Sequence, residues 1–293
     1  MATGPVSVQP PFDDDAGALA WLESYEGSLL DLLHSAETSG FDELVARLVD
    51  AFWPLFLRHH NYGVWLPAHE IGLAAARRAG NQALVRQMLL SGAIGLTAAG
   101  RQDDAIRWYT DALDDARAAG DLRDEGQAHL GLSACHFEAG RHDQARASLS
   151  QAIALWESCG YPRGIALAKI TLGEMDLNAA PGQALDTLTE AHALLLKTGD
   201  SYEVARVLVL RGRARFLTGD VEDGIREMTD GLTTLTEADG TRRRAHALEL
   251  LGNAYQELGN TATALDCYQQ AASLYMVMRP ADAERVSALA AGL

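Results

Sequence analysis

Residues 248–271 read LELLGNAYQELGNTATALDCYQQA, and small residues and tyrosines recur in this stretch at spacings of three and four residues. Three small residues let neighbouring helices approach closely, and two tyrosines fill the gaps between those helices. These residues are Gly252, Ala264, Ala271, Tyr255 and Tyr268. Gly259 lies between the two apolar runs, and glycine is the usual residue where a helix ends. The stretch therefore predicts two antiparallel α-helices joined by a tight turn.

Glycine recurs along the whole chain in the same way, with a helix stop about every twenty residues. The first set lies at Gly40, Gly80, Gly120, Gly160, Gly199 and Gly240, and a second set lies about midway at Gly100, Gly140, Gly219 and Gly259. A single helix pair cannot bury its apolar face alone, so neighbouring pairs must stack. We predict an all-α fold without strands: a right-handed α-solenoid of about fourteen helices, in antiparallel pairs with a period of about 40 residues.

These stops divide the chain into four predicted segments. They are an extended proline-rich arm (1–12), an N-terminal helical cap with a degenerate repeat (13–81), five repeats (82–280) and a C-terminal capping helix (281–293). The arm carries three prolines, which exclude a helix. Within the repeat segment the five units are expected at 82–121, 122–161, 162–200, 201–241 and 242–280.

The balance of charge argues against an autonomous nucleic-acid-binding protein. Lys and Arg total 24 and Asp and Glu total 40, so the net charge is −16 and a phosphate backbone would be repelled. The three cysteines are widely separated, and this spacing indicates neither a zinc site nor a disulfide framework. With no secretory pattern and no apolar run long enough to span a membrane, we expect a cytoplasmic protein without a membrane partner.

The last full repeat resembles the tetratricopeptide pattern in Leu251-Gly252-x-x-Tyr255 and Ala264-x-x-x-Tyr268, with Leu248 in place of the usual tryptophan. The period exceeds the roughly 34 residues of the standard repeat, which makes each helix about one turn longer. Long-period units of this kind resemble the tetratricopeptide sensor domains of large bacterial signal-transduction ATPases.

The N-terminal part resembles the segment that opens the C-terminal repeat region of actinobacterial antibiotic-regulatory activators. The resemblance lies in Ala20-Trp21-Leu22-Glu23, Leu29-Leu30, Ala51-Phe52-Trp53-Pro54 and Ala68-His69-Glu70. In that family the repeat domain follows a DNA-binding domain and a nucleotide-binding switch. This chain contains neither a G-x-x-x-x-G-K-[ST] loop nor a basic reading helix. The resemblance therefore implies a sensor or docking part without the motor, and transcription activation does not carry over.

In the tetratricopeptide family the first helix of each pair lines the concave side of the stack. Positions i, i+3, i+7 and i+10 of each first helix predict that lining. The middle of the groove is then apolar and its C-terminal end polar, which is typical of a binding surface. A register error of one residue would instead make the same positions ordinary core. The candidate ligand-binding residues are Phe137, Leu167, Ile170, Glu174, Leu177, Arg206, Val209, Arg213, Phe216 and Asn253.

Arg206 and Arg213 stand two turns apart on the predicted lining, and the run Arg242-Arg243-Arg244 follows in the sequence. An arginine fork matches a carboxylate or phosphate. The alternative is that these arginines pair with the protein's own acids, such as Glu203 or Glu249. Arg213 is expected to matter more for binding than any histidine.

The histidines His59, His60 and His69 lack metal-ligand spacing, and we expect partly exposed histidines at helix ends instead. We predict no metal, no cofactor and no catalytic residue.

Three hypotheses of function remain open. The first is a non-catalytic adaptor or regulatory sensor that binds a peptide, a protein segment or a small anionic or apolar effector in the groove. The second is a biosynthetic enzyme in which arginines hold an anionic substrate and Glu174 acts as acid or base. The third is a self-assembling homodimeric scaffold. A buried Glu174 with a strongly shifted pKa in a closed pocket would favour the enzyme.

Overall fold

The computed structural model describes residue 12, residues 14–237 and residues 240–293, and these residues form sixteen α-helices and no strand. The first six are α1 (Asp15–Glu26), α2 (Leu29–Thr38), α3 (Asp42–Ala51), α4 (Trp53–His59), α5 (Tyr62–Arg78) and α6 (Gln82–Ala98). The next five are α7 (Gln102–Ala119), α8 (Leu122–Glu138), α9 (His142–Ser158), α10 (Pro162–Asp176) and α11 (Pro181–Leu195). The last five are α12 (Ser201–Leu217), α13 (Val221–Glu237), α14 (Thr241–Glu257), α15 (Thr261–Met278) and α16 (Pro280–Ala291). The predicted all-α class is confirmed.

The number of helices in the described residues exceeds the fourteen expected, because the segment before Gln82 forms five helices, of which α1–α4 are short. Gly27 and Ser28 separate α1 from α2. Pro54 lies in the first turn of α4, which begins directly after the cap of α3. A proline fits well in the first turn of a helix, where its missing N–H has no intrahelical partner to lose, and this favours the start of a new helix here.

Nine of the ten periodic glycines adopt the left-handed conformation predicted for them, with φ between 65° and 100°. Gly240 is the exception, because its φ is −77° and it caps the N-terminus of α14. A Cβ at Gly240 would lie 2.6 Å from Cε2 of Tyr202. This position therefore requires glycine for close packing on the Tyr202 ring rather than for a left-handed turn.

The chain divides into two compact units, which we call unit 1 (residues up to Ser91) and unit 2 (residues from Gly92). In unit 1 the ring of Trp65 is fully buried and stacks on Phe56 with 5.7 Å between the ring centroids. His69 is buried in the same core, with its Nδ1 2.9 Å from the carbonyl oxygen of Trp65 and its Nε2 2.9 Å from Oγ of Ser91. Aromatic packing of this kind gives unit 1 its core.

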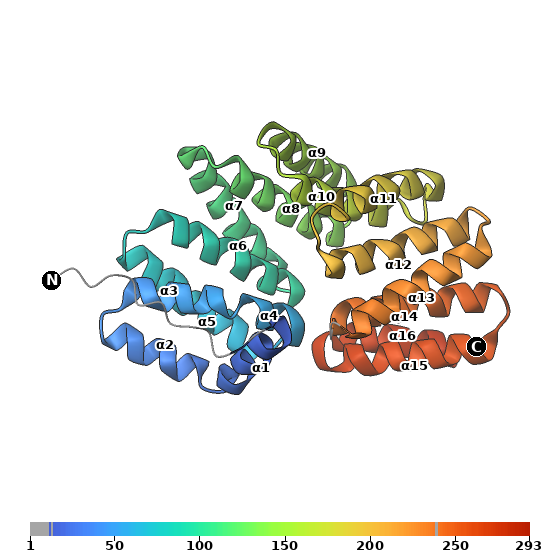
Figure 1. Cartoon of the computed structure of the whole chain (residues 1–293), viewed down its shortest axis with the longest axis horizontal. Helices are drawn as coiled ribbons and strands as arrows, with labels where there is room; N and C mark the ends of the chain where they lie inside the picture. The colour runs from blue at the N-terminus through green and yellow to red at the C-terminus, as the bar shows by residue number, and fades with distance from the viewer. Residues whose placement is uncertain (1–11, 13, 238–239) are drawn as a thin grey trace. The chain divides into compact units, whose positions relative to one another are not determined.

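Unit 2 is a series of helix pairs, α8 with α9, α10 with α11, α12 with α13 and α14 with α15, and α16 packs against α15 (Figure 1). Glycine allows the closest of these contacts. A Cβ at Gly212 of α12 would lie 2.6 Å from the carbonyl oxygen of Gly224 in α13, so the two backbones touch. Gly252 allows the ring of Tyr268 to pack on α14 in the same way, as the small-residue pattern predicts.

The proline-rich arm lies, apart from Phe12, outside the described residues. Among the described helices, none is both long enough and apolar enough to span a bilayer. The predicted division into arm, cap, repeats and capping helix stays a prediction.

Candidate functional site: a pocket in unit 2

A pocket of about 430 Å³ opens within unit 2. Its lining comes from the last part of α6 and from α7, α8, α10, α12, α14, α15 and α16. Its volume falls within the roughly 300–1,000 Å³ range that is typical of small-molecule sites. The lining residues fall into two groups of opposite chemistry.

The first group, which we call the apolar wall, consists mainly of aliphatic and aromatic side chains. Its members are Ile94 of α6, Leu130, Ala134 and Phe137 of α8, and Met175 of α10. The three α8 residues are four and three positions apart, so the helical repeat places them on one face. Gly131 is also in the lining and is backed by the ring of the buried Tyr109.

The second group begins with an ion-pair network on α10, α12 and α14. Nη2 of Arg206 lies 2.9 Å from Oε2 of Glu174, and Nη1 of Arg206 lies 3.4 Å from Oε2 of Glu203. Nη2 of Arg243 lies 3.7 Å from the other oxygen of Glu203. The exposed fractions of the Arg206 and Glu203 side chains are 14% and 11%, so these charges are poorly solvated.

Arg242 also lines the pocket, and it has no carboxylate partner among the described residues. Nε of Arg206 is buried and has no hydrogen-bond partner within the described part of the chain. Gly240 provides no side-chain cap for α14, and the first turn of this helix contains no acidic residue. We call Arg206, Arg242 and Arg243 the arginine cluster. These three residues have unused capacity to donate hydrogen bonds to an anion.

The C-terminal helices complete the polar side of the pocket. Nη1 of Arg285 lies 2.6 Å from Oε1 of Glu249, and the hydroxyl of Tyr275 lies 3.2 Å from Oε2 of the same carboxylate. Arg279 lies 2.8 Å from Asp282 and 4.0 Å from Glu138 of α8. The acids at this edge therefore have partners within the protein.

The pKa values in the arginine cluster follow from these contacts. Burial raises the pKa of Glu174. The positive charge of Arg206, with His246 and Arg243, outweighs this effect and lowers the pKa to about 2. Burial lowers the pKa of His246, and Glu174 and Glu249 offset this only in part. Burial and the charge of Arg206 lower the pKa of Arg243. At neutral pH Glu174 is therefore a carboxylate held by Arg206 and a poor proton donor.

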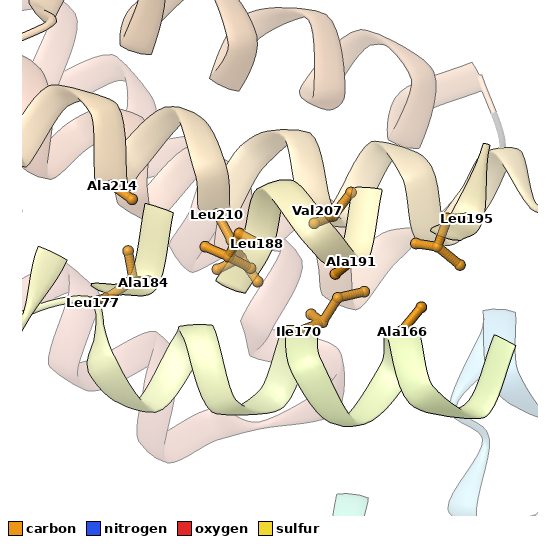
Figure 2. Packing of buried hydrophobic residues seen from close by; sticks show 10 residues of the cluster. All are labelled: Ala166, Ile170, Leu177, Ala184, Leu188, Ala191, Leu195, Val207, Leu210 and Ala214. Carbon is orange, nitrogen blue, oxygen red and sulfur yellow. The ribbon is translucent and has the colours of Figure 1, made fainter. Parts of the chain in front are cut away.

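The structure brings three of the predicted site residues into the pocket, namely Phe137, Glu174 and Arg206. Ile170 and Leu177 lie instead in the buried cluster between α10, α11 and α12, where Ile170 points toward Ala191 (Figure 2). Val209 and Phe216 are also core residues, and Leu167 is half-buried outside the lining. Ile170, Leu177, Val209 and Phe216 are therefore core residues, which is the alternative that the sequence left open.

Arg213 and Asn253 also lie outside the pocket lining. Arg213 is buried, pairs with Glu257 at 2.5 Å and lies over the ring of Phe216. Oδ1 of Asn253 lies 2.8 Å from the hydroxyl of Tyr268. A binding role for either residue stays a prediction.

Sequence reasoning missed the part of the pocket contributed by Tyr275, Arg279 and Arg285. These residues belong to the end of the last repeat and to the capping helix, for which the repeat pattern assigns no concave face. In the sequence Arg242 and Arg243 stand out only as a basic run. The signal that could have found them is their position at the start of a first helix, one turn before His246, which also lines the pocket.

The expectation of partly exposed helix-end histidines fits His59, which is half-buried at the end of α4, but it is wrong for His69, which is buried within α5. His59 bridges Glu23 and Glu26 at 3.1 and 3.0 Å, and His69 contacts Trp65 and Ser91. Among the described residues no group of three His, Cys, Asp or Glu side chains has metal-site geometry.

The comparisons with known proteins agree with this fold. A family model described as tetratricopeptide repeat matches residues 245–275. The fold is tetratricopeptide-like. No curated protein matches the chain in sequence.

Several solved structures are similar to the chain at low sequence identity. A Signal Transduction ATPase with Numerous Domains from Pyrococcus horikoshii, with a tetratricopeptide repeat sensor, is 16% identical with a TM-score of 0.62. The match covers 92% of this chain and 40% of that one, so the chain spans less than half of its length. A Rap protein complexed with competence and sporulation factor is 11% identical with a TM-score of 0.65, covering 96% of this chain and 89% of that one. The apo quorum sensor NprR from B. thuringiensis is 12% identical with a TM-score of 0.56, covering 94% and 86%. At these identities the likeness shows a shared fold.

Proposed function

We propose that the chain is a non-catalytic regulatory binding module whose pocket in unit 2 holds a ligand with both an anionic group and an apolar body. The observation that carries this proposal is the composition of the cavity described above. The apolar wall and the arginine cluster line the same pocket, so one ligand with an apolar body and an anionic group can contact both.

The similar structures support a regulatory role by analogy. They include a tetratricopeptide repeat sensor, a Rap protein with a bound factor and a quorum sensor. The sequence resemblance to the repeat region of actinobacterial antibiotic-regulatory activators points the same way. In this proposal ligand binding changes how the repeat stack engages a protein or peptide partner.

The electrostatics of Glu174 favour binding over catalysis. A general acid or base works best when its pKa lies near the working pH. A strongly shifted pKa of a buried Glu174 is expected to favour the enzyme. The shift is large, but it lowers the pKa to about 2, away from neutrality, and the Glu174 side chain is 31% exposed, so this expectation does not support the enzyme. Its contact with Arg206 fits a charge that holds the arginine in place.

A pocket-filling variant tests the proposal. Ala134 lines the pocket, so Ala134→Phe places a ring in the apolar half, whereas Ala118→Phe adds the same ring on the exposed end of α7. Thermal unfolding is followed with small acids, uncharged amphiphiles and acidic peptides. A ligand that binds the folded state raises Tm, and we expect this for the wild type and Ala118→Phe but not for Ala134→Phe.

Equal stabilisation of the two variants by every ligand would place binding outside the pocket. Conversion of a stabilising ligand into a product during the same incubation would support the enzyme hypothesis instead.

A further inference from the structure

Taking the proposed function as its basis, we infer that the ligand is a small amphiphilic carboxylic acid. Its carboxylate lies against Arg206, Arg242 and Arg243, and its apolar body lies along α8. This assignment selects one ligand class among the effectors and peptides that a tetratricopeptide-like pocket could hold.

The charge of the cluster matches a single negative charge. Among the described residues, the three guanidinium groups are matched by two carboxylates, those of Glu174 and Glu203, which leaves one positive charge over. Arg242 has no carboxylate partner among the described residues, and Arg243 is 3.7 Å from its nearest one. The buried Nε of Arg206, which lacks a partner in the described chain, is an independent sign of a missing acceptor. A carboxylate supplies two acceptor oxygens and one charge.

The hydrogen-bonding groups of the lining argue against an extended peptide. Each peptide residue brings an N–H and a C=O that need partners when they are buried. Gln127 is the only side-chain amide among the described lining residues. The hydroxyls of Thr97 and Thr171 already donate to carbonyls of their own helices at 2.9 and 3.1 Å, and that of Tyr275 bonds Glu249. A ligand with one polar end and an apolar body leaves no such groups unpaired.

The apolar wall fits the remainder of such a ligand. Leu130, Ala134 and Phe137 form one continuous face of α8, and Met175 adds a flexible side chain from α10. Methionine adapts to apolar ligands of different shape. The wall should therefore accept either a flexible chain or a rigid aromatic body.

Isothermal titration calorimetry tests the assignment with four probes. These are decanoate, 1-naphthaleneacetate, the uncharged analogue decanol, and an acidic apolar hexapeptide. The decisive variant is Arg242→Gln, which should fold because Arg242 makes no ion pair with a described residue. Arg244→Gln is the matched control, since Arg244 is two positions further along α14, is half-buried like Arg242 and does not line the pocket.

The wild type is expected to bind both acids more tightly than decanol. Arg242→Gln should weaken the acids about tenfold or more, as for loss of a charge-assisted hydrogen bond, and leave decanol unchanged. Arg244→Gln should behave as wild type. No binding of either acid, equal affinities for decanoate and decanol, or equal effects of the two substitutions would overturn the assignment.

The same titrations separate this assignment from the proposed function. If the hexapeptide binds more tightly than both acids and Ala134→Phe abolishes its binding, the pocket is a binding site and the ligand class is wrong. If Ala134→Phe leaves the binding of every probe unchanged, the pocket is not the site, and both proposals fail.

Discussion

At the scale of single residues, the contact between Glu174 and Arg206 influences how strongly the pocket binds an anion. Nη2 of Arg206 lies 2.9 Å from Oε2 of Glu174. Glu174 therefore accepts a hydrogen bond from Arg206 that a ligand carboxylate could otherwise accept. The contact therefore sets the affinity of the pocket as well as its charge.

Glu174→Gln should strengthen the binding of decanoate. The substitution removes one of the two negative charges beside the arginine cluster and frees Arg206, so we expect affinity to rise several-fold. Calorimetry on the wild type and the variant measures the change, with decanol as the probe that should not respond. Weaker decanoate binding in the variant, with its fold intact by circular dichroism, would show that Glu174 assists the ligand rather than competing with it.

The buried His69 of unit 1 makes folding stability depend on pH. Burial lowers its pKa to about 4, although the hydrogen bond to the Trp65 carbonyl raises it, whereas the unfolded chain has the ordinary value of 6.5. Between these values the unfolded state binds the proton and the folded state does not. Stability is therefore complete above about pH 6.5 and is lost as pH falls toward 4.

The wild type should lose on the order of 2 kcal/mol between pH 7.5 and 5 through His69. His69→Gln should show a correspondingly smaller pH dependence in urea unfolding followed by tryptophan fluorescence. His34→Gln is the control, because His34 is exposed and bonds the carbonyl of Leu30 in its own helix. The same pH dependence in all three proteins would exclude His69 as the source.

At the scale of helices, the contact between α12 and α13 depends on the absence of side chains. A Cβ at Gly212 would lie 2.6 Å from the Gly224 oxygen, which belongs to the backbone and cannot turn away. Gly182, near the start of α11, faces open space, since a Cβ there would have no atom within 4 Å among the described residues. The two glycines therefore differ in packing although both are helical.

Gly212→Ala should lower the free energy of unfolding by about 1–3 kcal/mol, as overpacking usually does. Gly182→Ala should be neutral or stabilising by up to about 1 kcal/mol, because alanine favours the helix. Denaturant titration of both variants gives the two differences. A Gly212→Ala variant as stable as Gly182→Ala would contradict the close approach of the two backbones.

The helix pattern was accessible from sequence because it rests on local conformation. A left-handed glycine ends a helix wherever it occurs, and nine of the ten glycine positions act in this way. Gly240 differs because Tyr202, which lies 38 positions earlier in the chain, requires space there. The short helices before Gln82 depend on Gly27, Ser28 and Pro54, which interrupt the period.

At the scale of the whole molecule, the pocket depends on contacts that the repeat does not encode. Arg279, at the junction of α15 and α16, reaches within 4.0 Å of Glu138 on α8. The sequence predicts a concave face on each first helix, and Phe137, Glu174 and Arg206 lie in the pocket accordingly. It could not show that Ile170 or Val209 is buried, because a rotation of one residue about the helix axis exchanges groove for core.

Photo-crosslinking with a decanoate analogue that carries a diazirine at its tail tests most directly whether the pocket in unit 2 binds an amphiphilic carboxylic acid. The modified residues are located by mass spectrometry of proteolytic fragments. We predict labelling of Leu130–Phe137 on α8 and of Met175. This labelling should be suppressed by excess decanoate and reduced in Arg242→Gln but not in Arg244→Gln. Labelling confined to unit 1, or labelling of α8 that is equal in these two variants, would contradict it.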